Sequence, residues 1–133
     1  MTIDFDAAPF IAARKCHQLE IAEDYTELIN DLIEEKGEAR VGDIATFIGV
    51  SHVTALRAVQ RLERDGYVIT NPHKPIQLTE KGRKLGQFSK KRHQTLFAFL
   101  IKIGVPSEVA KIDAEGIEHH ISDKTLEVIE KYL

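Results

Sequence analysis

The middle of this chain contains two short segments of helical periodicity joined by a tight turn. Few folds accommodate two helices at this spacing. Apolar residues recur at helical spacing over residues 41–48 and again over about 52–65. The Gly-Val-Ser turn at 49–51 separates them, and its serine suits the N-cap of the second helix. Residues 67–70 and 76–79 have strand composition, with a proline-containing loop between them. This order predicts a winged helix-turn-helix, with the hairpin as the wing.

The flanking segments are predicted to be helical. Residues 21–35 carry apolar positions at the spacing of a strong amphipathic helix, whereas residues 1–18 show no clear period and suggest a mobile or weakly helical extension. Thr79 is expected to cap a helix of about 80–103, Ser107 a helix to about residue 120, and Ser122 a last helix carrying Leu126, Ile129 and Leu133. The expected fold class is therefore mainly α, with a winged helix-turn-helix followed by a helical domain.

The composition argues against a membrane-spanning or secreted protein. No apolar run approaches the roughly 20 residues of a membrane span, and acids stand at the N-terminus where a signal peptide has basic residues. The single cysteine, Cys16, favours a cytoplasmic protein without internal disulfides. Net charge is −3, yet residues 36–92 hold twelve Lys and Arg against five acids. A basic middle between acidic ends fits a DNA-binding module joined to a cation-binding module.

The second helix of the motif would read DNA. Val53, Leu56, Val59 and Leu62 are expected to face the core, and Arg57 to reach a guanine edge in the major groove. Since one reading helix covers only a few base pairs, specific binding implies a homodimer on a two-fold site in double-stranded operator DNA. Solvated surface charge, or a winged helix used for protein contacts, is the simpler alternative. The candidate DNA-binding residues are Arg40, Ser51, His52, Thr54, Ala55, Arg57, Arg61 and Lys74.

Six side chains on three predicted helices form a candidate metal site. Glu115, Glu118 and His119 fall at i, i+3 and i+4 on one helix face, and Asp24 and Glu27 are spaced i, i+3 on another helix. The set is Asp24, Glu27, His93, Glu115, Glu118 and His119. Four carboxylates and two imidazoles without sulfur suit Mn²⁺, and Fe²⁺ less well, and their charge matches two divalent cations. Each motif alone is more often ordinary surface charge. The Cys16-His17 pair lacks a matching pair of ligands for zinc.

These residues resemble the manganese transport regulators, the manganese-sensing branch of the diphtheria-toxin-repressor family, over about residues 23–120. The resemblance implies a homodimeric, Mn²⁺-activated repressor of metal-uptake genes with a binuclear site on the six residues above. Iron-sensing relatives carry Met and Cys where Asp24 and Glu115 stand here. The segments that carry the resemblance are Glu23-Asp24-Tyr25-x-Glu27, Gly49-Val50-Ser51, Leu78-Thr79-x-x-Gly82, Arg92-His93 and Asp113-x-Glu115-Gly116-x-Glu118-His119-His120.

The sequence thus predicts a cytoplasmic metal-dependent repressor and no enzyme. Its expected parts are an extension over 1–19, a DNA-binding domain over 20–88 and a metal-binding and dimerisation domain over 89–133. About two Mn²⁺ per subunit are expected, and the ligands also accept Fe²⁺, Co²⁺ or Zn²⁺. The main alternative is a winged-helix regulator that senses a small organic ligand, with a structural carboxylate cluster. A metallohydrolase and a metal-storage protein are further alternatives.

Overall fold

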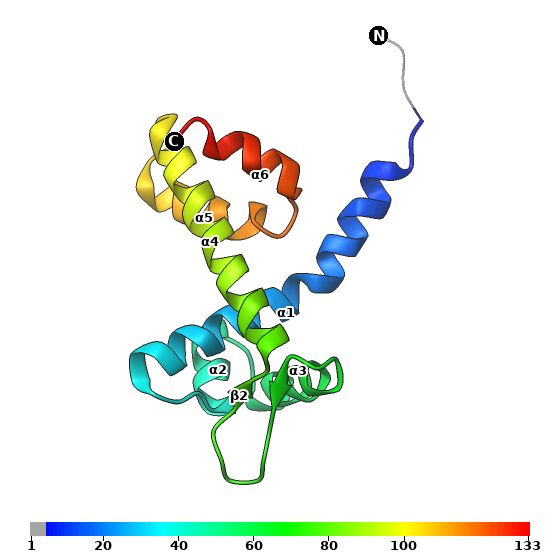
Figure 1. The fold of residues 1–133 in the computed structure, drawn as a ribbon, viewed down its shortest axis with the longest axis vertical. Coiled ribbons are helices and arrows are strands. Elements are labelled where there is room, and N and C mark those ends of the chain that lie inside the picture. Colours follow the sequence, from blue (N-terminus) through cyan, green and yellow to red (C-terminus); the bar gives the residue numbers. More distant parts are fainter. Residues whose placement is uncertain (1–4) are drawn as a thin grey trace. The chain divides into compact units, whose positions relative to one another are not determined.

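The computed structural model describes residues 5–133 and divides the chain into two compact units. One unit spans residues 21–91, and the other combines residues 92–133 with the N-terminal segment up to Glu20. The described residues form six helices and one two-stranded sheet (Figure 1). In chain order these elements are α1 (Ala8–Lys36), α2 (Val41–Ile48), α3 (His52–Arg64), β1 (Val68–Ile69), β2 (Gln77–Leu78), α4 (Glu80–Lys102), α5 (Ser107–Ile117) and α6 (Asp123–Glu130).

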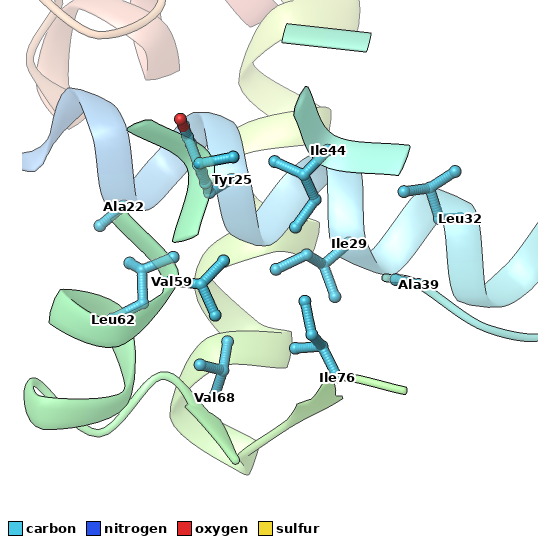
Figure 2. Packing of buried hydrophobic residues seen from close by; sticks show 11 residues of the cluster. Ala22, Tyr25, Ile29, Leu32, Ala39, Ile44, Val59, Leu62, Val68 and Ile76 are labelled. Atoms are coloured by element: carbon cyan, nitrogen blue, oxygen red, sulfur yellow. The ribbon is translucent and has the colours of Figure 1, made fainter. Parts of the chain in front are cut away.

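The unit of residues 21–91 is the predicted winged helix-turn-helix. Its core gathers apolar side chains from α1, α2, α3 and the strands, and Ile29, Ile44 and Val59 are essentially inaccessible to solvent (Figure 2). Gly49 ends α2 in the left-handed conformation, with a φ of 81°, which other residues rarely adopt. The Ser51 side chain then accepts a hydrogen bond from the Thr54 backbone N–H, which confirms the predicted cap of α3.

The wing is shorter than the sequence predicts. Antiparallel β1 and β2 pair over two residues each, with Val68 opposite Leu78. Beyond this ladder the Ile76 N–H donates to the Ala39 carbonyl at 2.8 Å, so the hairpin is tied to the segment before α2. The Thr79 hydroxyl accepts from the Gly82 N–H at 3.1 Å, as expected of a residue that caps α4.

Helices α1 and α4 approach closely inside this unit at a glycine. A methyl group added to Gly86 would lie 2.6 Å from the Thr26 carbonyl oxygen, so only glycine fits there. Nearby, the Lys90 ammonium donates to Asp31 at 2.9 Å. That hydrogen bond raises the pKa of Lys90. These contacts fix how α4 packs against α1 inside this unit.

The second unit has a small core of Leu96, Ala114 and Leu126, with partly buried apolar residues around it. The Ser122 side chain accepts from the Thr125 N–H and caps α6, as predicted. Pro106, however, occupies the N-cap of α5, so the expectation that Ser107 caps this helix is wrong. Proline fixes a φ near −65°, and the extended conformation of Pro106 lets α5 begin at the serine.

The N-terminal prediction also needs correction. Helix α1 begins at Ala8, well before the predicted start at residue 21, and most side chains of its first turns are exposed. A solvated helix needs no apolar period, which is why the sequence pattern did not reveal it. Residues 1–4 of the predicted extension lie outside the described residues. None of the helices in residues 5–133 is long and apolar enough to cross a membrane.

Candidate metal centre

The end of α5 brings three of the predicted ligands together. Glu115 lies on the helix, Glu118 occupies its C-cap in a helical conformation, and His119 follows in the turn. Each offers a ligand atom, and these atoms lie within 4.8 Å of one another. The helix stops at Ile117, earlier than predicted, yet the helical backbone of Glu118 preserves the expected spacing of the ligands.

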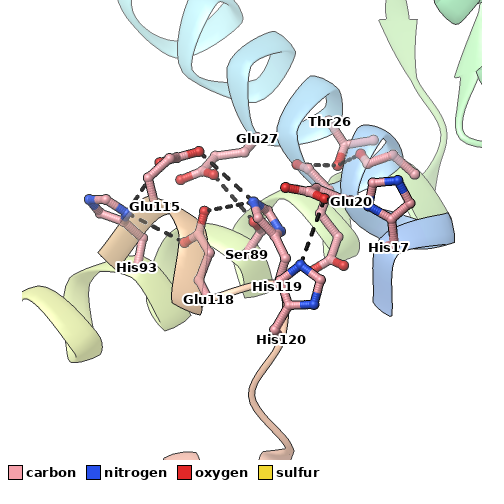
Figure 3. A network of polar contacts seen from close by, with 12 residues as sticks. His17, Glu20, Thr26, Glu27, Ser89, His93, Glu115, Glu118, His119 and His120 are labelled. Atoms are coloured by element: carbon pink, nitrogen blue, oxygen red, sulfur yellow. Dashed lines mark hydrogen bonds and ion pairs between the residues drawn. The ribbon is translucent and has the colours of Figure 1, made fainter. Parts of the chain in front are cut away.

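His93 from α4 joins the same cluster. Its Nδ1 lies 3.3 Å from a Glu115 carboxylate oxygen and 3.5 Å from one of Glu118. The His119 Nε2 lies 3.3 Å from the other Glu118 oxygen (Figure 3). Glu118 therefore stands between two imidazoles, with one of its carboxylate oxygens near each ring.

Burial sets the electrostatics of this cluster. The Glu118 side chain is 0% exposed and that of His119 is 1% exposed, whereas Glu115 is half exposed. A charged carboxylate that is removed from water needs positive charge or hydrogen bonds close by. Two carboxylates and two imidazoles are oxygen and nitrogen donors without sulfur, which Mn²⁺ and similar cations accept. The donor set of this unit therefore fits a divalent metal ion.

A largely buried arginine, which the sequence did not single out as a site residue, holds the turn that carries these ligands. The Arg92 guanidinium donates to the Ile121 carbonyl and lies 4.0 Å from Asp123 at the start of α6. Arg92 directly precedes His93, so α4 supplies both a candidate ligand and an anchor for the turn after His119. Local spacing carries no signal for such a long-range contact.

The other two predicted ligands lie on α1 in the unit of residues 21–91. The half-buried Glu27 carboxylate accepts a hydrogen bond from the Ser89 hydroxyl of α4 at 3.2 Å. Asp24 is also half-buried. Burial raises the pKa of the neighbouring Tyr25, and the negative charge of Asp24 raises it further. Both carboxylates thus stand in partly desolvated surroundings rather than in open solvent.

Most predicted DNA-binding side chains lie on the surface of the same unit. His52, Thr54, Arg57 and Arg61 are exposed along α3, and Ser51 precedes them as the cap. Arg40, before α2, lies 3.2 Å from Glu38, and Lys74 lies exposed in the wing. An array of exposed basic side chains along one helix and a wing suits contacts with nucleic acid.

One face of α3 differs from the prediction. Ala55 is 0% exposed and packs in the core, so the expectation that it touches DNA is wrong. Val53 and Leu56, expected in the core, are 56% and 38% exposed. The buried stripe follows Ala55, Val59 and Leu62, because a small side chain lets α3 approach the other helices closely.

Two family models match almost the whole chain. The N-terminal DNA-binding domain of iron-dependent repressors matches residues 18–76, and their metal-binding and dimerisation domain matches residues 79–133. The transcriptional regulator MntR of Escherichia coli O6:H1 is 45% identical over 118 residues, which cover 89% of this chain and 76% of that protein. The HTH-type transcriptional regulator MntR of Geobacillus kaustophilus is 48% identical over 100 residues, covering 75% and 71%. The chain belongs to the iron-dependent repressor family.

Solved structures agree with this assignment. A manganese-dependent transcriptional repressor in complex with manganese superimposes with a TM-score of 0.76 at 29% identity, covering 84% of this chain and 51% of that one. The manganese regulator SloR gives 0.75 at 26% identity, covering 84% and 52%. The chain thus spans about half the length of these solved chains.

Membership in the iron-dependent repressor family and the similarity to its named relatives confirm four sequence predictions. The chain is a metal-dependent transcriptional repressor and not an enzyme, and it combines a winged helix-turn-helix with a metal-binding and dimerisation domain. The resemblance to manganese transport regulators is confirmed by the relatives named MntR. These findings favour the metal-dependent repressor over the regulator that senses an organic ligand.

Proposed function

We propose that this protein is a cytoplasmic, Mn²⁺-activated repressor that binds operator DNA of metal-uptake genes as a homodimer. The observation that carries the proposal is the buried pair Glu118 and His119, flanked by His93 and Glu115. A buried carboxylate between two imidazoles, with no thiolate in the cluster, suits a hard or borderline divalent cation. The similarity to a manganese-dependent repressor supports manganese as that cation.

The full ligand set that we propose includes both carboxylates of α1. Asp24 and Glu27 would add two negative charges to those of Glu115 and Glu118, which together match two divalent cations per subunit. Oxygen donors dominate this set, and Mn²⁺ prefers oxygen to sulfur. The corresponding domain division places DNA binding in residues 20–88 and metal binding with dimerisation in residues 89–133.

In the proposed mechanism, metal binding affects DNA binding because the ligands come from two different segments of the chain. When bound, the metal supplies positive charge that offsets carboxylate repulsion. Asp24 and Glu27 lie on α1, which is part of the DNA-binding core, whereas Glu118 and His119 end α5. Because ligands on both segments bind best in one arrangement, metal binding selects a conformation of the dimer that fits two half-sites.

In the DNA-binding domain, different residues are proposed to provide affinity for DNA and recognition of the base sequence. Arg57 is proposed to contact a base edge in the major groove, with His52 and Thr54 nearby on α3. Arg61, Arg40 and Lys74 are proposed to contact phosphates, which set register and affinity but carry little sequence information.

The test is DNA binding against Mn²⁺ concentration, measured by fluorescence anisotropy on the promoter that precedes a manganese transporter gene in the protein's own genome. We expect tight binding with Mn²⁺ and loss of binding with a chelator. His119→Ala should abolish the Mn²⁺ response, whereas Glu127→Gln on the exposed face of α6 should preserve it. Equal DNA binding with chelator and with Mn²⁺ would refute the proposal.

A further inference from the structure

A second cluster of metal-ligating side chains stands in the unit that holds His93 and Glu118, but on other residues. The Glu20 carboxylate on α1 lies 3.2 Å from the His17 Nδ1, one turn earlier on the same helix. The same carboxylate oxygen lies 3.8 Å from the His120 Nε2 (Figure 3). One oxygen therefore faces two imidazole nitrogens that come from distant parts of the sequence.

The two contacts to the Glu20 oxygen are close to the spacing of ligand atoms around one cation, and a shared ion requires the exposed His17 imidazole to rotate towards His120. Two ligand atoms about 2.1 Å from a metal at a tetrahedral angle lie ~3.4 Å apart. The two distances from the Glu20 oxygen, 3.2 and 3.8 Å, stand on either side of that value. In the metal-free protein the shorter contact is a hydrogen bond through an imidazole proton, and a metal ion takes the place of that proton.

Exposure lets these side chains adjust to an ion. The His17 side chain is 79% exposed, that of His120 41% and that of Glu20 29%. His120 also lines a surface hollow of about 480 Å³ beside the first turns of α1, next to Pro9 and Cys16. This hollow leaves room for the imidazole to rotate and for water to complete the coordination of an ion.

We propose that His17, Glu20 and His120 form a second metal site, which takes one borderline divalent transition metal such as Zn²⁺ or Co²⁺. Two imidazoles and one carboxylate with open positions form a common transition-metal ligand set. The site is distinct from the Mn²⁺ centre proposed above, because it shares no ligand with it. His120 nevertheless follows His119 directly, so an ion held here restrains the backbone of the Mn²⁺ ligands.

The test uses Zn²⁺ as the probe, titrated calorimetrically into the metal-free full chain. We compare the double variant Glu118→Gln/His119→Ala, in which the first centre is disabled, with the same variant carrying His17→Ala in addition. His17 is the most exposed of the three ligands, so its removal leaves the fold intact. The matched control is His52→Ala, which removes another exposed imidazole from the surface of α3.

The double variant is expected to retain one Zn²⁺ per subunit. His17→Ala should weaken that binding by at least about 100-fold, because the loss of a direct ligand costs more than the 10–100-fold that the loss of an outer hydrogen-bonding partner costs. Glu20→Gln should do the same, whereas His52→Ala should leave the isotherm unchanged. Superimposable isotherms with and without His17→Ala would overturn the proposal and leave this cluster an ion pair only.

If the double variant does not fold, the Co²⁺ absorption spectrum of otherwise unaltered protein replaces the titration. Co²⁺ bound by two imidazoles and a carboxylate gives visible ligand-field bands. We expect His17→Ala to remove one set of bands per subunit. An unchanged spectrum would equally overturn the proposal. Neither result depends on DNA binding, so failure here is distinct from failure of the Mn²⁺-activated repressor.

Discussion

The variant Glu118→Gln distinguishes two possible roles of Glu118, as a metal ligand or as a structural hydrogen-bonding group. The two roles predict opposite changes in the free energy of unfolding of the metal-free protein. The substitution keeps the size of the side chain and removes one negative charge from a fully buried position. Glu115 and Glu118 place ligand oxygens within 4.8 Å of each other. Two full charges at that distance repel by about 3 kcal/mol at an effective dielectric constant near 20.

In the presence of a chelator, therefore, Glu118→Gln should not lower the free energy of unfolding. It should raise this free energy by up to about 3 kcal/mol, less whatever His93 and His119 already offset. A structural hydrogen-bonding role predicts the reverse, because loss of a buried hydrogen bond costs about 1–3 kcal/mol.

With Mn²⁺ bound, the wild type is expected to be more stable than Glu118→Gln. An ion present at about 1,000 times its dissociation constant stabilises the folded state by about 4.1 kcal/mol, and a 100-fold loss of affinity reduces this gain to about 1.4 kcal/mol. The assay is urea unfolding followed by circular dichroism, with chelator and with Mn²⁺, for wild type and variant. Glu127→Gln on α6, where the side chain is 59% exposed, serves as the control. An undiminished Mn²⁺ gain in Glu118→Gln would refute the assignment of Glu118 as a ligand.

Three further predictions concern the framework around the two sites. Gly86→Ala should destabilise the chain by about 1–3 kcal/mol because it forces α1 and α4 apart, whereas Gly116→Ala, which meets no atom within 4 Å, should stabilise α5 by up to about 1 kcal/mol; urea unfolding measures both, and equal effects would contradict the close approach. Arg92→Met should weaken Mn²⁺ binding by about 10–100-fold because it releases the turn after His119, and unchanged calorimetric affinity would assign Arg92 to stability alone. The partner Asp31 raises the pKa of Lys90, so the pair contributes to the free energy of unfolding fully below about pH 10.4, and this contribution is lost as the pH rises through the raised pKa. For a pair that is about one third exposed the contribution is no more than about 1 kcal/mol. Lys90→Met should lack this alkaline decline in the free energy of unfolding, and a pH profile identical to that of the wild type would contradict the prediction.

Local chemistry explains which parts of the fold were predictable. The caps by Ser51, Thr79 and Ser122 follow from side-chain oxygens that precede helical patterns, and the structure confirms each of them. The spacing of Glu115, Glu118 and His119 survives although α5 ends early, because the C-cap keeps a helical backbone. Such features depend on a few neighbouring residues, so they can be predicted from the sequence.

Most of the failures originate in long-range packing, and one originates in solvation. Hydrophobicity favoured Val53 and Leu56 for the core, but the helices meet where the small Ala55 lets them approach. The first turns of α1 carry no apolar period because they are solvated, and the nearness of Glu20 to His120 depends on the tertiary fold. The anchor from Arg92 to Ile121 is likewise invisible to spacing, although Arg92 directly precedes a predicted ligand.

The turn after α5 joins these observations, because four consecutive residues in it face different partners. Glu118 and His119 point into the buried cluster, His120 faces a carboxylate of α1, and the Ile121 carbonyl accepts from Arg92 of α4. A backbone change at any one of these positions must move the others, since they are joined by single peptide units with few soft dihedrals. Metal affinity in this unit is therefore a property of the whole turn and its anchors, and substitutions that leave every ligand in place can still change it.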